Sequence, residues 1–298
     1  MKENIDLLVQ EIIKDNMIQK KFLASEVKKL TEEEENNLDQ YINYCSSINV
    51  NTKYLADSYN TLVNDSVREQ IFFDKHQHYR YTNYQDIKSS IYMNQHYMQY
   101  YMHGLAISMF LWPQHRKYMQ YFIDTIPKYK RGKYLEIGPG HGLYIKNAIK
   151  YCSFDFYEAI DISPTSINLV KLMLKSIIRK NTHYHVHQKY FLTMDNSKKY
   201  DAIIMSEVLE HVENPTLYLK KTSKLADTDT YIFITTCINA AMLDHIYLFN
   251  SIKHLEDIVS KSGLKIKNKL IIPYKNKTLE ESEKLKLPIN IAMLLEIL

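Results

Sequence analysis

Apolar residues in the first 130 positions recur every three or four places, which is the period of an amphipathic helix. Thr31 and Glu34 have the spacing of a capping box, so a helix is expected over about residues 32–46. Longer apolar stripes predict helices over residues 84–112 and 114–126. The first 130 residues are therefore predicted to be helical throughout. The positions that carry the helical period are Ile5, Leu8, Ile12, Ile13, Ile87, Ile91, Met98, Met102, Leu105 and Met109.

Short apolar runs alternate with amphipathic segments in the remainder of the chain. This alternation requires a parallel sheet with helices on both faces. The predicted fold class is therefore α/β, with a Rossmann-like domain over residues 131–298 behind an all-helical N-terminal module of residues 1–130. Strands are expected near 133–138, 154–161, 183–187, 200–205, 230–235 and 264–272, and helices near 142–150, 164–179, 214–225 and 251–262.

Residues 133–142, Lys-Tyr-Leu-Glu-Ile-Gly-Pro-Gly-His-Gly, place a glycine turn directly after an apolar strand. Gly138, Gly140 and Gly142 carry no Cβ, so the chain can turn sharply and its N–H groups can face a ligand. Asp161 follows roughly 20 residues later, at the end of the next apolar run, where a carboxylate accepts hydrogen bonds from ribose hydroxyls. Together these features predict a nucleoside pocket.

The spacing of the glycines distinguishes this turn from a dinucleotide-binding turn. A dinucleotide site has Gly-x-Gly-x-x-Gly, whereas this chain has Gly-x-Gly-x-Gly with Glu136 two residues before it. A carboxylate there would repel a diphosphate but suits a ligand that carries an ammonium or sulfonium. The pattern resembles motif I of the class I methyltransferases that depend on S-adenosylmethionine (SAM).

A second segment, residues 200–215, strengthens the resemblance. Its sequence, Tyr-Asp-Ala-Ile-Ile-Met-Ser-Glu-Val-Leu-Glu-His-Val-Glu-Asn-Pro, predicts a buried strand that turns outward at its carboxyl end, where ligands of open α/β sheets bind. It resembles motif IV of the same superfamily, and is most similar to the ubiquinone-biosynthesis O-methyltransferases and related small-molecule enzymes. The resemblance covers about residues 131–272.

The resemblance implies SAM as the cofactor and assigns roles by position. Glu136 and the three glycines would lie along the methionine moiety, Asp161 would bind the ribose, and Ile162 would pack on the adenine. In place of the acid that the family often uses for the adenine amine, this chain offers Tyr190 and Phe191, either of which could stack on the base. The expected cofactor contacts are Glu136, Gly138, Gly140, Gly142, Asp161, Ile162, Tyr190 and Ser206.

Glu207, Glu210 and His211 form a Glu-x-x-Glu-His set at the expected mouth of the pocket, and Glu207 and His211 are the expected catalytic residues. The small-RNA 2′-O-methyltransferases use a set of this kind with a further histidine to hold a divalent metal, and His245 is the candidate fourth ligand here. Such a metal would lower the pKa of an acceptor hydroxyl. The alternative is that Glu210 and His211 brace the helix entry, with His211 as a metal-free base or a substrate contact.

Three further histidines, His183, His185 and His187, alternate along the third expected strand and therefore share one face. No cysteine or carboxylate near them in the sequence completes a zinc site, so a partly covered sheet face is the favoured interpretation. His141 lies within the glycine turn, where it either approaches the donor carboxylate or occupies an ordinary loop position.

A tyrosine-rich run over residues 79–101, with Trp112 after it, is the expected source of substrate selectivity. In the superfamily that the chain resembles, helices before motif I commonly fold over the active site. Aromatic side chains there would offer apolar walls with a polar group at one end. His103 and His115 are further candidate bases from this module, and the alternative for each residue is a place in a helical core.

The composition of the chain limits the kinds of partner that are expected. The chain has 298 residues and a formal net charge of +4, which does not indicate a dedicated nucleic-acid binder. Its three cysteines, Cys45, Cys152 and Cys237, are widely spaced and form no metal or disulfide framework. No signal-peptide core or membrane-spanning apolar run is found, so a soluble cytoplasmic protein without a membrane partner is expected.

The sequence at the end of the chain is consistent with more than one structure. The fold that the chain resembles ordinarily has a seventh strand, antiparallel beside the fifth. Here residues 278–287 read as a helix, and an apolar tail with a helical look follows Pro288. Three alternatives remain: residues 289–294 supply the strand, the fold is trimmed, or the tail is buried in the partner of a homodimer.

The predicted function is transfer of a methyl group from SAM to oxygen or nitrogen of a small or medium-sized metabolite, such as a natural product, a sugar or a modified peptide. RNA or a protein side chain is the alternative acceptor. A second alternative is a catalytically inactive SAM-binding subunit that regulates a partner, although the intact motifs argue against it.

Overall fold

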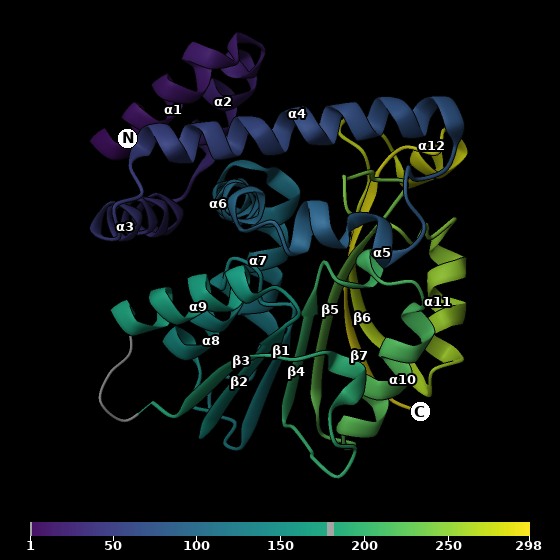
Figure 1. Ribbon diagram of the computed structural model, residues 1–298. Helices are drawn as coiled ribbons and strands as arrows, with labels where there is room; N and C mark the ends of the chain where they lie inside the picture. Colours follow the sequence, from purple (N-terminus) through teal and green to yellow (C-terminus); the bar gives the residue numbers. More distant parts are fainter. Residues whose placement is uncertain (1, 178–181) are drawn as a thin grey trace.

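The computed structural model describes residues 2–177 and 182–298. It consists of a seven-stranded sheet with helices on both faces and a layer of N-terminal helices at one end of the sheet (Figure 1). That layer contains α1 (Glu3–Asp15), α2 (Lys20–Glu26), α3 (Glu32–Ser47), α4 (Thr52–His76), α5 (Tyr84–Ile87), α6 (Gln95–Leu111) and α7 (Pro113–Thr125). The predicted helical character of the N-terminal region is confirmed.

Local signals explain where two of these helices begin. At the start of α3, the Thr31 hydroxyl accepts a hydrogen bond from the Glu34 amide at 3.2 Å, and the Glu34 carboxylate accepts one from the Thr31 amide at 2.7 Å. The predicted capping box is therefore confirmed. The expected helix over 84–112 was wrong in its length. Asn94 caps a new helix there by accepting a hydrogen bond from the Tyr97 amide, so α6 is separate from α5 and from the π-helical turn Lys88–Tyr92.

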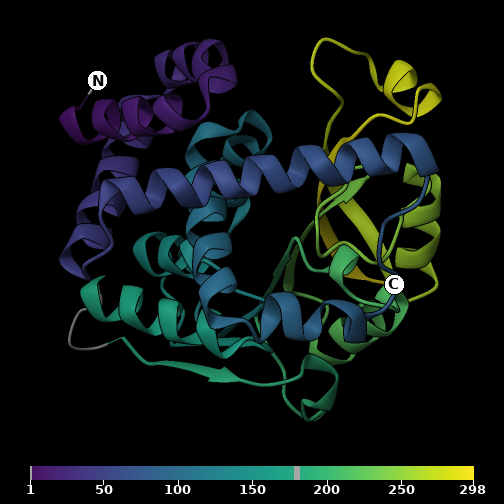
Figure 2. The same cartoon turned by 45° about the horizontal axis from the view of Figure 1, so that its top comes forward.

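Helix α4 is the longest element of the N-terminal layer, and it lies across α6 and extends towards the region of α12 (Leu279–Lys284) (Figures 1 and 2). Its Gln70 side chain accepts a hydrogen bond from the Ala241 amide at 3.0 Å, in the loop after the fifth strand. The N-terminal layer therefore covers the end of the sheet at which ligands of this fold class bind.

The sheet has the strand order β3-β2-β1-β4-β5-β7-β6. Strands β1 to β5 are mutually parallel where they pair, and β7 is antiparallel to both β5 and β6. The switch in strand order between β1 and β4 creates the crevice in which such sheets bind ligands. The strands are β1 (Lys133–Ile137), β2 (Phe156–Asp161), β3 (Tyr184–Gln188), β4 (Ala202–Ser206), β5 (Tyr231–Ile238), β6 (Leu264–Ile272) and β7 (Ile289–Ile297).

The structure decides between the three alternatives for the end of the chain. The tail is β7, inserted between β5 and β6, so the fold is not trimmed and the tail is not left for a partner chain. Ile291 and Met293 on one face and Ala292 on the other are all at most 1% exposed. A strand buried on both faces has no alternation of polar and apolar residues, which is why this one resembled a helix.

Two hydrophobic cores lie on the two faces of the sheet. On one face α7 packs with α8 (Leu143–Tyr151) and α9 (Pro164–Ile177), and on the other α10 (Pro215–Leu225) packs with α11 (Ile252–Ser260). The expected helix over 164–179 agrees with α9, and its last two residues lie outside the described part. Phe122 of α7 meets Phe233 of β5 with ring centroids 5.2 Å apart, so the N-terminal helices share a core with the sheet.

Within the described part of the chain, the helices are too short or too polar to cross a lipid bilayer.

Candidate active site

A cavity of about 880 Å³ lies between the carboxyl ends of the parallel strands and the N-terminal helices. Its walls come from the turn after β1, the end of β2, the segment after β4, the loop after β5, and helices α6 and α7. A volume in the upper part of the range for small-molecule sites, about 300–1,000 Å³, leaves space for two ligands side by side.

The glycine turn forms one wall of the cavity. Gly138, Gly140 and Gly142 have φ values of +66°, +49° and +77°, a region that residues with a Cβ rarely adopt. A Cβ on Gly138 would lie 2.8 Å from the Val208 side chain, and one on Gly140 would lie 3.2 Å from the sulfur of Met102. The turn therefore needs glycine for its conformation and for the space that it leaves towards α6.

Asp161 ends β2 at the same cavity. Its Oδ1 accepts a hydrogen bond from the Ser163 amide at 2.8 Å, and its Oδ2 accepts a longer one from the Gly140 amide at 3.4 Å. Burial raises the pKa of Asp161 to about 6, against the hydrogen bonds from Ser163 and Gly140, which lower it. The carboxylate is thus held in a fixed direction beside the turn, with lone pairs left for the hydroxyls of a sugar.

Glu136 lies behind the glycine turn and does not line the cavity. Its side chain is 2% exposed and accepts a hydrogen bond from the Tyr134 hydroxyl at 2.6 Å. Burial raises the pKa of Glu136 to about 8, and the hydrogen bond from Tyr134 opposes that shift. This position departs from the expectation that Glu136 lies along the methionine moiety, and it suits support of the strand before the turn.

The two aromatic candidates for the adenine differ in their surroundings. Tyr190 is 48% exposed and does not line the cavity, whereas Phe191 is 2% exposed and does. Ile162 also lines the cavity, and its carbonyl accepts a hydrogen bond from the Gln188 side chain at 2.8 Å. Of the two predicted alternatives, Phe191 is therefore the one that lines the cavity in this structure, and Tyr190 does not.

The segment after β4 carries two carboxyl groups: Glu207 lines the cavity, whereas Glu210 is buried and does not line it. Glu207 has φ +51°, a costly conformation for a residue with a Cβ, and its carboxylate accepts a hydrogen bond from the Thr235 hydroxyl at 2.7 Å. That hydroxyl also lies 2.9 Å from the Ser206 hydroxyl, which lines the cavity. Glu210 is fully buried, and burial raises the pKa of both carboxyl groups.

His211 is held by the loop after β5. Its Nδ1 lies 3.0 Å from the Asp244 carbonyl oxygen and 3.3 Å from Asp244 Oδ2. Asp244 is 2% exposed and also accepts hydrogen bonds from the hydroxyls of Tyr92 and Tyr101, at 3.1 and 2.8 Å. Burial alone would lower the pKa of His211, but the charges of Asp244 and Glu210 outweigh that effect and raise it. The charge of Asp161 also raises the pKa of His211, so these two side chains are close enough to interact electrostatically.

The four predicted metal ligands do not form one group. Among the described residues, Glu210 gathers with Cys237 and His245, and His211 gathers with Asp244 and His245, whereas Glu207 belongs to neither group. His245 Nδ1 lies 2.8 Å from the Ala240 carbonyl oxygen, so one of its nitrogens is already engaged. Glu207 points to Thr235 on β5 instead, because its left-handed backbone turns the side chain back towards that strand. The structure therefore does not bring the four predicted ligands to one point.

The remaining histidines have different surroundings. His115 and His141 line the cavity, and burial lowers their pKa values to about 4 and about 3. His103 lies outside that lining and meets the Tyr41 hydroxyl at 3.0 Å within the helical layer. His185 and His187 lie on β3, next to Glu158 of the paired strand β2, and do not line the cavity.

Sequence reasoning missed the residues that hold His211. Asp244 stands directly before His245, but no local pattern marks it as a partner of a histidine 33 positions earlier. Tyr92 and Tyr101 belong to the tyrosine-rich run that was expected to set selectivity, and two of its many tyrosines turn out to bind Asp244. Only the folded arrangement distinguishes them.

The fold and the cavity define a class of protein. A sheet of this order, with a glycine turn after β1 and an acid at the end of β2, is that of the class I SAM-dependent methyltransferases, and the residues of the cavity fit that cofactor. Residues 96–269 match the family model described as a methyltransferase domain. This segment is more than half of the chain, and the protein belongs to this family of SAM-dependent enzymes.

Individual relatives are distant. N-methyltransferase 4 of Papaver somniferum is 25% identical over 112 residues, which are 37% of this chain and 32% of the relative. The mitochondrial ubiquinone biosynthesis O-methyltransferase of Dictyostelium discoideum is 29% identical over 99 residues, 33% of this chain and 26% of the relative. The chain thus matches about a third or less of the length of these relatives.

A solved structure extends the likeness to most of the chain. The mitomycin 7-O-methyltransferase MmcR has a TM-score of 0.54 with 9% sequence identity, over 83% of this chain and 70% of that one. At this identity the likeness concerns the fold alone.

Proposed function

We propose that this protein transfers the methyl group of SAM to an oxygen or nitrogen of a small or medium-sized metabolite, with His211 as the base. The observation that carries the proposal is that the glycine turn and the His211–Asp244 pair line the same cavity. The two distant relatives are named as an N- and an O-methyltransferase, and the structural neighbour acts on mitomycin, which agrees with a small acceptor. A natural product, a sugar or a modified peptide would suit the cavity.

The donor side is assigned to the glycine turn and the residues around it. When bound, SAM supplies a methyl group on a positively charged sulfur. The glycine turn leaves space for its methionine part, Asp161 accepts hydrogen bonds from the ribose hydroxyls, and Ile162 with Phe191 packs against the adenine. Glu136 supports the turn from behind through its bond with Tyr134. Ser206 lies on the same wall, at the end of β4.

The acceptor side is assigned to His211 and its partners. Because Nδ1 of His211 faces the Asp244 carbonyl, its proton sits on that nitrogen, and Nε2, which lies 3.9 Å from Glu210 Oε1, is left to accept one from the substrate. A positioned base of this kind contributes about 10²–10⁴-fold to a rate. Glu207, whose pKa is raised by burial and by the nearby Glu210, is assigned to hydrogen-bond the acceptor in its protonated form.

The N-terminal helices are assigned the role of orienting the acceptor and excluding water. Met98, Met102 and Met109 of α6 line the cavity with Trp112, and together they form its apolar side. Fixing the acceptor in line with the methyl group can account for about 7–11 kcal/mol of the barrier. In this proposal residues 1–130 are an acceptor-binding module and residues 131–298 the SAM-binding domain.

The test is methyl transfer from SAM labelled in its methyl group into a cell extract divided into metabolite, RNA and protein fractions. We expect label in the metabolite fraction, identified by mass spectrometry, and none with the His211→Gln variant. Label in RNA or protein would assign the alternative acceptor. Calorimetric binding of SAM without label in any fraction would instead identify an inactive SAM-binding subunit.

A further inference from the structure

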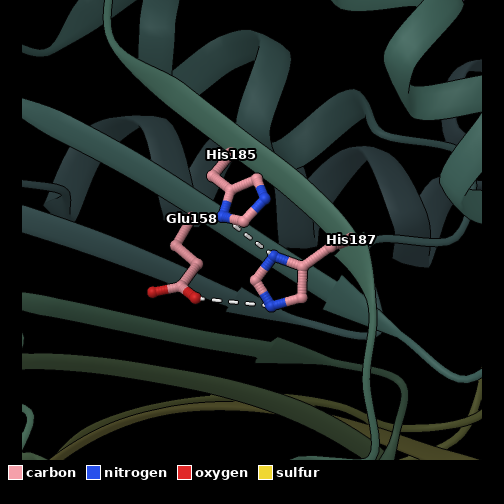
Figure 3. A group of neighbouring side chains, drawn as sticks. All are labelled: Glu158, His185 and His187. Carbon is pink, nitrogen blue, oxygen red and sulfur yellow. Dashed lines mark hydrogen bonds and ion pairs between the residues drawn. The ribbon is translucent and has the colours of Figure 1, made fainter.

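Strands β2 and β3 bring together, outside the cavity, three side chains of types that commonly bind metals. Glu158 of β2 is paired in register with His185 of β3, and His187 lies two positions further along β3. All three side chains lie on the same face of the sheet, and His187 contacts each of the other two (Figure 3). The sequence showed three alternating histidines without an acid, and the strand pairing supplies a carboxylate 27 positions before His185.

His187 directs one ring nitrogen to each of the other two side chains, and only one of these nitrogens can bind a given ion. Nδ1 of His185 lies 3.1 Å from Nδ1 of His187, and Nε2 of His187 lies 3.5 Å from Oε1 of Glu158. With one atom taken from each residue, all three lie within 4.8 Å of one another. Ligands at about 2.0–2.1 Å from a tetrahedral zinc ion are roughly 3.3 Å apart, so small side-chain rotations are enough to close the site.

The surroundings of Glu158 leave one oxygen for a metal. Its Oε2 accepts a hydrogen bond from the Tyr200 hydroxyl, which fixes the direction of the carboxylate, while Oε1 faces His187. A ligand held by an outer hydrogen bond in this way is typical of metal sites. The ammonium group of Lys198 lies 3.8 Å from Oε1, but its side chain is 46% exposed and can move into solvent when a cation binds.

The two histidines are accessible from solvent, Glu158 is buried behind them, and all three residues are separate from the active site. The Glu158 carboxylate is 4% exposed, the His187 side chain is 23% exposed, and His185 is exposed, so a bound ion would have protein on one side and water on the other. None of the three lines the cavity. The site is also rigid, because its residues stand on two paired strands rather than on a loop.

We propose that Glu158, His185 and His187 bind a divalent transition-metal ion, for which zinc is the best match, with water completing its coordination. Two imidazoles and one carboxylate suit zinc, whereas magnesium and calcium require mostly oxygen ligands. The ion would join β3, the edge strand, to β2 and would stabilise that edge without taking part in methyl transfer. The proposal is independent of the proposed function.

The test is calorimetric titration of the chelator-treated full chain with zinc sulfate, combined with the metal content after dialysis. We expect one zinc ion per chain, a rise in melting temperature with zinc, and no response to magnesium or calcium at the same concentration. In His185→Asn and His187→Asn the affinity for zinc should fall by at least about tenfold, as it does when metal sites lose even an outer partner. Glu158→Gln keeps an acceptor for Tyr200 and should show the same loss.

The matched control is His183→Asn, since His183 is an exposed histidine two residues before His185 that belongs to none of the metal-binding groups among the described residues. It should bind zinc like the unchanged protein. The proposal is wrong if the unchanged protein binds no zinc. It is equally wrong if the double variant of His185 and His187 keeps its full zinc content, because the ion would then lie elsewhere, such as at His245.

Discussion

The donor and acceptor sides of the cavity are built in opposite ways. The donor side comes from one continuous strand–turn–helix–strand segment, in which the glycine turn and Asp161 are about 20 residues apart. The acceptor side joins residues from distant parts of the chain, since Tyr92 and Tyr101 are 152 and 143 positions from Asp244. The donor side uses backbone amides and one carboxylate, whereas the acceptor side uses a buried network of ionisable side chains.

Because of this difference, substitutions on one side of the cavity should leave the other side largely unchanged. A local turn depends on its own few residues, so the donor side survives substitutions elsewhere. The acceptor side depends on how α6 lies over the loop after β5, and one altered contact there shifts the hydrogen bonds of Asp244 and, through them, His211. Substitutions on the two sides should therefore affect different measurable constants.

The largest effect is expected from His211→Gln, which removes the base and keeps a side chain of similar size. We expect kcat to fall by about 10²–10⁴-fold, while the Kd of S-adenosylhomocysteine stays unchanged. Steady-state kinetics and calorimetry measure the two constants. His76→Gln, at the exposed end of α4, is the matched control. A kcat within about tenfold of the unchanged enzyme would assign the base elsewhere, with His115 as the next candidate.

Asp161→Asn should weaken binding of S-adenosylhomocysteine and leave kcat nearly unchanged, which is the reverse of the result expected for His211→Gln. Hydrogen bonds to a charged group contribute about 1.5–3 kcal/mol, so loss of the charge should weaken binding of S-adenosylhomocysteine by about 10- to 100-fold. At saturating SAM, kcat should change little, because His211 and its partners remain in place. Asp155→Asn, in the exposed turn before β2, is the control. A large fall in kcat with unchanged binding would contradict the separation of the two sides.

Glu136→Gln tests the support behind the donor turn through stability. Burial raises the pKa of Glu136 to about 8 from its ordinary value of 4.5, so between these pH values only the folded chain holds the proton. Stability is therefore lost as pH rises through this window, by up to about 1.4 kcal/mol per pH unit. Urea unfolding at several pH values between 5 and 8, in this window, should show a flatter dependence for the variant. Parallel curves would mean that Glu136 is ionised in the folded protein.

The smallest effect is expected from Tyr101→Phe, which removes one hydroxyl from Asp244 and keeps the ring. The Asp244 charge would then be less neutralised and would hold a proton on His211 more strongly. We expect the acid limb of the kcat/KM profile to move to higher pH by about half a unit to one unit. Tyr97→Phe, on the same helix but bonded to Asp65, should leave the profile in place. A shift to lower pH would contradict the assigned role of Asp244.

Much of the fold followed from local patterns. The alternation of apolar strands and amphipathic helices placed β1 to β6 near their observed positions, and the Thr31–Glu34 capping box marked the start of α3. The break at Asn94 was missed because the apolar stripe continues across it. The strand β7 was left undecided because burial on both faces removes the period that distinguishes a strand from a helix.

In the candidate site, too, some positions follow from the local sequence and others only from packing. Asp161, Ile162, Gly138 and Gly140 line the cavity, because a strand followed by a tight turn fixes the direction of a few neighbouring residues, whereas Gly142 does not line it. Tyr190 and Phe191 are adjacent in the chain, and only packing decides which of them faces the ligand. Glu207 was expected with Glu210, His211 and His245 as a metal ligand. It lies near Glu210, but its carboxylate accepts a hydrogen bond from Thr235 and it joins neither metal group among the described residues.

The α/β class, the family resemblance and the donor turn can be recognised in the amino-acid sequence, because they depend on the periodicity and spacing of nearby residues. The tertiary structure alone decided which side chains hold His211, where the last strand is inserted, and that Glu158 meets two histidines on the next strand. The physical reason is that contacts between distant segments depend on how helices and strands pack, and no local spacing encodes that packing.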